Sequence, residues 1–283
     1  MASDSVTVDP TYAQTLKALH RPGEPLVVTN VHDLSSLQAV LSLNTSTDKP
    51  VKAVATASYS IAETIGTKDG DLTLQQNLAA IAPIARATRA AGIPLTADLQ
   101  DGYGEEIESA IQEAVRLGVS GANLEDRLPG NLPQPARIET SLYSLDVQVD
   151  RLKRALQVAA KAGVSDFVIN ARTDVMTLDP RPEGALEETI RRGKAYLAAG
   201  AMTVFVWGGG IGLSSEDIKA LVQAFDGRLS VLLSRKPDGL SVKELANLGV
   251  ARISIGPTLW LIALAAVKET ATRLLAGGKV FVG

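Results

Sequence analysis

One unit recurs along the chain: an apolar run, a polar loop, an amphipathic stretch, and then a small or apolar residue followed by glycine. Glycine commonly takes the left-handed position just after a helix end, so each stop indicates where a helix finishes and a strand follows. The stops are Ala91-Gly92, Leu117-Gly118, Ala162-Gly163, Ala199-Gly200 and Leu248-Gly249. A chain built from this unit alternates strand and helix, which favours a parallel sheet covered by helices.

The apolar runs predict eight strands, and their largely non-alternating character suits parallel strands buried on both faces. The predicted strands are Leu26 to Thr29, Ala53 to Ala57, Leu95 to Ala97, Gly121 to Leu124, Phe167 to Asn170, Thr203 to Val206, Ser230 to Leu233 and Arg252 to Ile255. The predicted helices are Thr11 to His20, Leu34 to Leu43, Leu74 to Ala91, Ile107 to Leu117, Leu145 to Ala162, Glu183 to Ala199, Ser215 to Phe225, Val242 to Leu248 and Leu259 to Leu275. Over 283 residues this alternation predicts an α/β fold, a single (β/α)8 TIM barrel domain spanning 1–283, with a doubly wound open sheet as the alternative.

Charge and composition exclude several classes of function. The net charge is -3 with no basic block, which argues against nucleic acid or an anionic membrane as partner. The absence of cysteine excludes disulfides, thiolate metal sites and a cysteine catalyst, and two histidines are too few for an ordinary catalytic zinc site. Residues Met1 to Pro10 lack a signal-peptide pattern, and the apolar stretch Leu259 to Val267 is too short for a bilayer span, so we expect a soluble cytoplasmic protein.

The end of the third strand carries the strongest functional pattern. The run Pro94-Leu-Thr-Ala-Asp98-Leu-Gln-Asp-Gly-Tyr-Gly104 delivers acidic and amide oxygens into a glycine-bracketed loop. Such oxygens are the hard ligands that Mg²⁺ prefers, although an acidic turn that caps the next helix is the simpler alternative. A second acidic strand end, Gly121-Ala-Asn-Leu-Glu125-Asp126, follows one unit later and favours the metal site, because both ends would reach one rim.

Other strand ends offer further polar side chains, each with a structural alternative. After the first strand, Asp33 is expected to cap the next helix rather than bind a ligand, and His32 is a candidate acid or base. After the second, the hydroxyls of Ser58 and Tyr59 would donate to a substrate carboxylate or stay solvated in a loop. After the fifth, Arg172 would either grip a carboxylate or phosphate with two prongs or form a structural ion pair across the rim.

The sixth strand is followed by a run of glycines. Gly208, Gly209 and Gly210 precede a predicted helix, so they would form either an anion-binding nest or a flexible turn. They lack the G-x-G-x-x-G spacing of a dinucleotide site, which excludes NAD on this motif.

Taken together, these residues resemble the isocitrate lyase and phosphoenolpyruvate mutase superfamily, in its small-enzyme branch, over almost the whole chain. The motifs that carry the resemblance are Asn30-Val-His-Asp33, Ala55-Thr-Ala-Ser58 with Gly66-Thr-Lys-Asp69-Gly70, Ala97-Asp98-Leu-Gln-Asp-Gly-Tyr-Gly104, Gly121-Ala-Asn-Leu-Glu-Asp126, Asn170-Ala-Arg-Thr-Asp174, Arg192-Gly-Lys-Ala-Tyr-Leu-Ala-Ala-Gly-Ala201 and Glu244-Leu-Ala-Asn-Leu-Gly-Val-Ala-Arg-Ile-Ser-Ile-Gly256. The resemblance implies a (β/α)8 barrel whose last helix swaps between subunits of a dimer, usually within a tetramer (a dimer of dimers). It also implies Mg²⁺ or Mn²⁺ and a small keto or hydroxy acid that reacts through a pyruvate-like enolate.

The same resemblance implies a role for each site residue. Asp98 would be the main metal carboxylate, Glu125 would bind the metal directly or through water, and Asp69 would order the metal's waters. Arg172 would hold the substrate carboxylate, and the other implied substrate-binding positions are Ala57, Ser58 and Asn123.

Three departures from the family pattern matter for function. Gln100 replaces the second acid of the metal motif and removes one negative charge, and Ala57 stands where a serine donor is frequent. The lyases carry a Lys-Lys-Cys-Gly-His type loop after the Leu-Glu-Asp motif, whereas this chain reads Arg127-Leu-Pro-Gly-Asn-Leu-Pro-Gln-Pro135. Without a loop cysteine, cleavage of isocitrate or methylisocitrate by the cysteine-dependent route is excluded, and the proton would come from water, Tyr59 or His32. Asn131 would match the loop asparagine of the mutases only in a shifted alignment.

These observations predict a Mg²⁺-dependent carbon–carbon lyase that decarboxylates an oxaloacetate-like acid or cleaves a substituted malate. The alternatives are P–C bond chemistry on phosphonopyruvate or phosphoenolpyruvate, and a catalytically silent relative that binds a small acid. The apolar helix that contains Trp260 to Val267 should be buried between subunits, unless it packs in the outer layer of its own barrel.

Overall fold

Eight parallel strands close into one barrel in sequence order, and β8 pairs with β1 to complete it. The computed structural model describes residues 9–130 and 134–280. The strands are β1 (Leu26–Val31), β2 (Val54–Thr56), β3 (Leu95–Asp98), β4 (Gly121–Glu125), β5 (Val168–Thr173), β6 (Thr203–Val206), β7 (Leu229–Leu232) and β8 (Arg252–Ser254). The prediction of a (β/α)8 barrel is confirmed, and the open-sheet alternative is wrong because β1 and β8 pair with each other.

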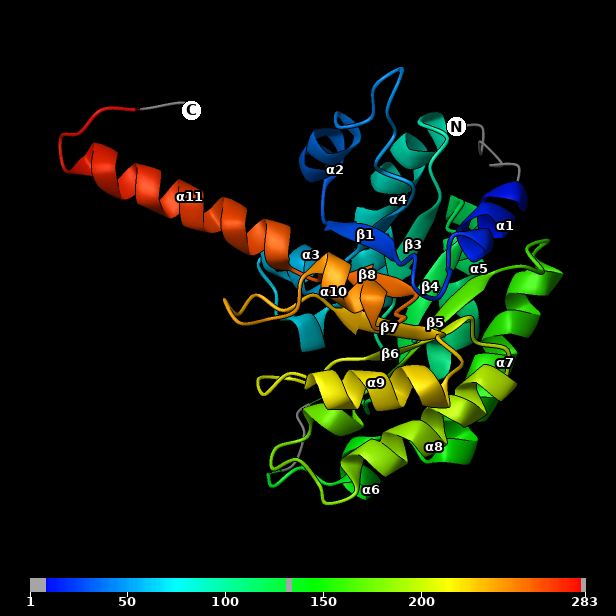
Figure 1. Ribbon diagram of the computed structural model, residues 1–283. Helices are drawn as coiled ribbons and strands as arrows, with labels where there is room; N and C mark the ends of the chain where they lie inside the picture. Colours follow the sequence, from blue (N-terminus) through cyan, green and yellow to red (C-terminus); the bar gives the residue numbers. More distant parts are fainter. Residues whose placement is uncertain (1–8, 131–133, 281–283) are drawn as a thin grey trace.

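Helices surround the barrel wall, as Figure 1 shows. They are α1 (Thr11–Ala18), α2 (Leu34–Leu41), α3 (Ser58–Thr64), α4 (Leu74–Ala90), α5 (Ile107–Leu117), α6 (Ile138–Ser141), α7 (Leu145–Lys161), α8 (Ala185–Ala198), α9 (Ser215–Ala224), α10 (Val242–Asn247) and α11 (Thr258–Leu275). Nine were predicted from the sequence, within two residues at each end; α3 and α6 were not. The sequence of α3 offers few helix signals, and its burial of Ile61 and Ala62 against the core explains why a run of hydroxyl residues is helical there.

Local signals set the helix ends as predicted. Asp33 caps α2, since its carboxylate accepts a hydrogen bond from the Ser36 backbone N–H at 2.7 Å. The expectation that Asp33 is a cap is therefore confirmed. At the other end of a helix, Gly118 closes α5 with φ at 94°, a conformation that costs glycine little.

Side chains alternate between the two faces of the barrel wall. Outward residues such as Val204 and Ile253 join the apolar layer beneath the helices. Inside, Asn123 accepts hydrogen bonds from the Asn170 amide at 2.9 Å and from the buried Arg252 guanidinium at 3.2 Å. Leu16 of α1 packs with strand residues in a separate buried apolar cluster. The inner polar bonds join β4, β5 and β8 beneath the barrel mouth, which gives the strand ends a fixed arrangement.

The last helix leaves the barrel. Figure 1 shows α11 extending away from the other elements, and none of its residues is buried. Ile262 and Val267 are 61% and 63% exposed, and Val27 on β1 is 36% exposed although wall strands of a barrel are normally covered. The prediction's alternative, a helix packed in the outer layer of its own barrel, is wrong. Within the described ranges, no helix has both the length and the apolar character needed to cross a membrane.

Candidate active site at the barrel mouth

The C-terminal ends of β3, β4 and β5 bring Asp98, Glu125 and Arg172 together. Glu125 and Arg172 occupy paired positions on neighbouring strands, and Asp98 ends the strand beside them. Their side chains interact: Arg172 Nη1 lies 2.7 Å from Glu125 Oε2, and its charge opposes the rise that burial causes in the pKa of Asp98. The barrel therefore brings these three side chains to one rim, as the sequence predicted.

The carboxyl groups of Asp98 and Glu125 lie where nearby negative charge exceeds nearby positive charge. The pKa of Glu125 is raised to about 8, mainly by burial, which Arg172 opposes and which Asp174 and Asp98 reinforce. Burial also raises the pKa of Asp98, with Asp69 as the second cause. The Arg172 guanidinium therefore interacts with three carboxylates, those of Asp98, Glu125 and Asp174, and Asp69 adds a fourth negative charge near them, so a proton or another cation is favoured there.

Arg172 is held in a fixed plane. Its Nε and Nη2 donate to the two oxygens of Asp174 at 2.8 and 2.9 Å, a two-pronged charge-assisted pair. The rings of Phe205 and Trp207 lie 5.9 and 5.3 Å from its Cζ. The structural ion pair considered from the sequence exists, and it aims the guanidinium across the mouth.

Two further polar contacts lie beside this group, one from Ser58 to Asp98 and one from Gln100 to Asp69. Ser58 donates to Asp98 Oδ2 through both its backbone N–H, at 3.1 Å, and its hydroxyl, at 3.2 Å. The donor that the sequence assigned to a substrate carboxylate is therefore engaged with Asp98, and Ala57 forms the extended N-cap of the same helix. Gln100 donates from Nε2 to the carbonyl and to Oδ1 of Asp69, at 2.6 and 3.0 Å. Gln100 thus positions Asp69 and keeps its own Oε1 available.

His32 and Tyr59 do not join this group. His32 is half-buried, and burial lowers the pKa of its imidazole although the carboxylate of Asp33, 3.9 Å away, opposes this. Tyr59 is 41% exposed and its ring meets Trp260 edge-on at 5.9 Å, toward α11. The geometry gives neither side chain support as the proton donor.

Two nearby acids have purely structural partners. Asp101 accepts from the backbone N–H groups of Tyr103 and Gly104, from the Tyr143 hydroxyl and from Arg151. Asp126 accepts from Thr173, the Asp174 N–H, Arg192 and Tyr196. Because their oxygens are already satisfied, neither acid is available as a metal ligand in place of Asp98.

Sequence reasoning missed residues that act from other elements. Asn77, fully buried on α4, donates to the Asp98 carbonyl at 2.9 Å and to the Tyr103 hydroxyl at 2.7 Å. Its signal was visible as a polar residue on the apolar face that includes Leu74 and Ile81. Trp207 carries no local signal of a site role, since its place beside Arg172 depends on the pairing of β5 with β6.

The residues at the mouth fit a divalent metal, with a limit. In the part of the chain that the structure describes, no three His, Cys, Asp or Glu side chains converge closely enough to form a metal cage. Mg²⁺ needs no such cage, because it is usually bound by one or two carboxylates and keeps several waters. Burial, together with repulsion from neighbouring carboxylates, raises the pKa values of Asp98 and Glu125, and a divalent cation would neutralise this buried negative charge.

Comparison with known proteins finds relatives over most of the chain. The family model described as phosphoenolpyruvate phosphomutase matches residues 16–275. A crystal structure of a putative phosphonomutase from Burkholderia cenocepacia J2315 is 33% identical, with a TM-score of 0.77 over 93% of this chain and 99% of that one. An oxaloacetate decarboxylase of Bradyrhizobium diazoefficiens is 30% identical over 62% of this chain and 57% of its own.

A third relative was solved with a small acid bound. Oxaloacetate acetylhydrolase in complex with its product oxalate is 25% identical, with a TM-score of 0.80 over 98% of this chain and 91% of that one. The relatives thus include both phosphonomutases and enzymes that act on C–C bonds of small acids. The chain belongs to the phosphoenolpyruvate phosphomutase family, within the superfamily that it shares with the isocitrate lyases.

Proposed function

We propose that the protein is a Mg²⁺-dependent carbon–carbon lyase that decarboxylates an oxaloacetate-like acid or cleaves a substituted malate. The observation that carries this is the group of Asp98, Glu125 and Arg172 at the mouth, where excess carboxylate charge lies beside one oriented guanidinium. Asp98 and Glu125 would hold the metal, and Asp69 and the side-chain oxygen Oε1 of Gln100 would order the metal's waters. When bound, Mg²⁺ supplies a Lewis acid for the substrate's keto or hydroxyl oxygen.

Arg172 would bind the substrate carboxylate. Its Nη1 forms an ion pair with Glu125 Oε2 at 2.7 Å, and where Glu125 holds the metal this N–H would be available to the acid. Asp174 keeps the guanidinium plane fixed throughout, because both of its oxygens remain bonded to Nε and Nη2. A fixed donor stabilises charge that develops on the substrate without reorganising during the reaction.

In decarboxylation the C3–C4 bond of the oxo acid breaks, CO₂ leaves and the electron pair becomes an enolate of pyruvate. A proton on C3 then completes the product. No cysteine is present, Tyr59 faces α11 and His32 sits beside Asp33, so water is the proposed proton donor.

P–C bond chemistry is the second candidate, and the similarity to a putative phosphonomutase favours it. Asn131, the proposed counterpart of the mutase asparagine, lies outside the described residues. A silent relative that binds a small acid is the third candidate. It would keep the same site and lack turnover.

The assay compares oxaloacetate, isocitrate, methylisocitrate and phosphonopyruvate with purified protein and Mg²⁺. Because Mg²⁺ alone speeds the loss of CO₂ from oxaloacetate, Asp98→Ala protein at the same Mg²⁺ concentration is the blank. Pyruvate formation above this blank, exceeding any glyoxylate release from isocitrate, is the expected result. Rapid glyoxylate release would overturn the choice of an oxaloacetate-like or malate-like substrate over isocitrate. Phosphonopyruvate turnover would favour the second candidate, and inertness with oxalate binding retained would favour the third.

We also propose that α11 packs onto a second copy of the chain, forming a swapped dimer within a dimer of dimers. The apolar face of α11 is not buried, and Val27 is exposed on the barrel wall. In the swapped dimer, α11 of each copy would cover the exposed part of the other copy's barrel wall.

A further inference from the structure

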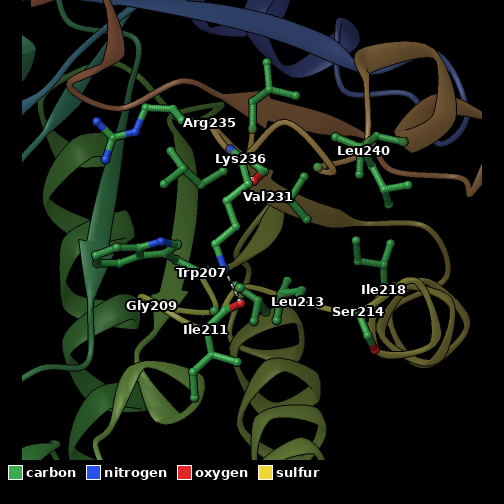
Figure 2. Close-up of a pocket in the computed structure, with 18 of the residues that line it drawn as sticks. Trp207, Gly209, Ile211, Leu213, Ser214, Ile218, Val231, Arg235, Lys236 and Leu240 are labelled. Atoms are coloured by element: carbon green, nitrogen blue, oxygen red, sulfur yellow. Dashed lines mark hydrogen bonds between the residues drawn. The ribbon is translucent and has the colours of Figure 1, made fainter. Parts of the chain in front are cut away.

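A pocket lies beside the mouth, between the loop that follows β6 and the loop that follows β7. Its volume is about 560 Å³, within the range of small-molecule sites. Figure 2 shows the two loops facing each other, with Trp207 on one side of the Lys236 side chain and Val231, Leu240 and Ile218 on the other. The proposed site residues Asp98, Glu125 and Arg172 do not line it.

The inner wall of the pocket is hydrocarbon, whereas its exposed rim carries polar and charged groups, among them Ser234, Arg235 and Asp238. The apolar lining includes the side chains of Val206, Leu213, Ile218, Val231, Leu240 and Leu245. Ile218, Val231 and Leu245 are buried members of the core, so the inner part of the pocket is continuous with it. Binding to such a surface is most favourable for an apolar group, because both apolar surfaces are then removed from water.

The loops have defined shapes. Arg181 Nη2 donates to the carbonyls of Gly208 and Gly212, at 2.8 and 3.0 Å. A Cβ atom at Gly208 would overlap the backbone of Gly212, so the tight turn requires glycine there. Of the two alternatives that the sequence left open for the glycine run, these contacts favour the turn, which Arg181 holds through the Gly208 and Gly212 carbonyls.

A single hydrogen bond joins the two loops. Lys236 Nζ donates to the Ile211 carbonyl at 3.1 Å, so the aliphatic stem of the lysine lines the pocket while its charge stays at the rim. Because both groups are exposed, this bond can open at little cost and admit a ligand.

Trp207 connects the pocket to the mouth. The same ring lines the pocket and lies 5.3 Å from the Arg172 guanidinium. An acid held by Arg172 thus has the apolar pocket one side chain away.

Resting on the proposed function, we infer that this pocket receives a hydrocarbon substituent of the acid that Arg172 holds. The substrate class is then a 2-oxo or 2-hydroxy acid with an alkyl branch larger than methyl. Unsubstituted oxaloacetate would use only the mouth.

The test measures dissociation constants by calorimetry, with Mg²⁺, for oxalate and for N-alkyl oxamates from methyl to hexyl. These planar, unreactive acids mimic a pyruvate enolate, and their alkyl chain leaves from the position of substrate C3. Each buried methylene should tighten binding about fourfold, the fold-change that corresponds to ~0.8 kcal/mol per CH₂. Leu240→Trp, which fills the pocket, should abolish the gain with chain length and leave oxalate binding unchanged.

Leu43→Trp is the matched control, because Leu43 is 58% exposed and does not line the pocket. It should keep the full chain-length gain. Oxalate binding with no gain from longer chains would overturn this inference alone, as would a gain that survives Leu240→Trp. Loss of oxalate binding in the unsubstituted protein would overturn the proposed function, so the two failures are distinct. Oxalate binding in Leu240→Trp also reports that the variant is folded.

Discussion

Replacing Arg172 with lysine should damage the site far more than the same change at a matched surface arginine. Arg172 makes three charge-assisted contacts, one with Glu125 and two with Asp174, at 2.7, 2.8 and 2.9 Å. A lysine ammonium is a point charge on a flexible stem and cannot reproduce a planar fork. Two of the three contacts would be lost, and the fully buried Asp174 would lose one of the two hydrogen bonds that it accepts from Arg172.

The magnitude follows from those contacts. A hydrogen bond to a charged group contributes about 1.5–3 kcal/mol, so two lost contacts should lower the free energy of unfolding by about 3 kcal/mol. One lost contact to the substrate carboxylate, at about 2.7 kcal/mol, should lower kcat/KM roughly a hundredfold. The acid then binds in a plane that is no longer fixed, so the loss should appear in kcat as well as in KM.

Arg191→Lys is the control. Arg191 forms the same two-pronged pair with Glu188, at 2.6 and 2.8 Å, but its side chain is 58% exposed. An exposed pair of this kind contributes about 0–1 kcal/mol, so stability and turnover should hardly change. Urea denaturation and the oxaloacetate assay give the two measurements. Equal effects of Arg172→Lys and Arg191→Lys would refute the argument that Arg172 acts through its buried, fixed geometry.

Three further outcomes are expected. Burial raises the pKa of Glu125 to about 8, and only the deprotonated carboxylate binds metal. As the pH rises from 6 to 8, the Kd for Mg²⁺ should therefore decrease roughly tenfold per pH unit, and above pH 8 it should become constant. Calorimetry from pH 6 to 9 tests this, and Glu125→Gln should remove the pH dependence. Asp98→Ala should abolish Mg²⁺-dependent oxalate binding without unfolding the barrel, whereas alanine at the exposed Asp48 should change neither, and retained binding in calorimetry would remove Asp98 from the site. Ile262→Glu on α11 should weaken assembly and lower the mass found by light scattering, and a monomeric mass for the unaltered protein at micromolar concentration would contradict the swapped dimer.

The fold was predictable because its signals are local and repeated. A glycine stop such as Gly118, a cap such as Asp33 and an apolar strand each act within a few residues, so they can be read from the chain without knowing what lies opposite. The helix α3 was missed because its stability comes from burying Ile61 and Ala62, a contact that no local pattern reveals.

For the site, the sequence by itself determined which carboxylates and which arginine reach the mouth, because strands of a parallel barrel all end at one rim. Only the tertiary structure decided how these side chains are used. It joined Ser58 to Asp98, set Gln100 against Asp69 and turned Tyr59 toward Trp260. Each of these pairings joins residues about thirty or more positions apart. A side chain's direction and partner depend on barrel closure and helix packing rather than on its neighbours in sequence, which is why residue type and strand-end position predicted the place of the site but not its bonds.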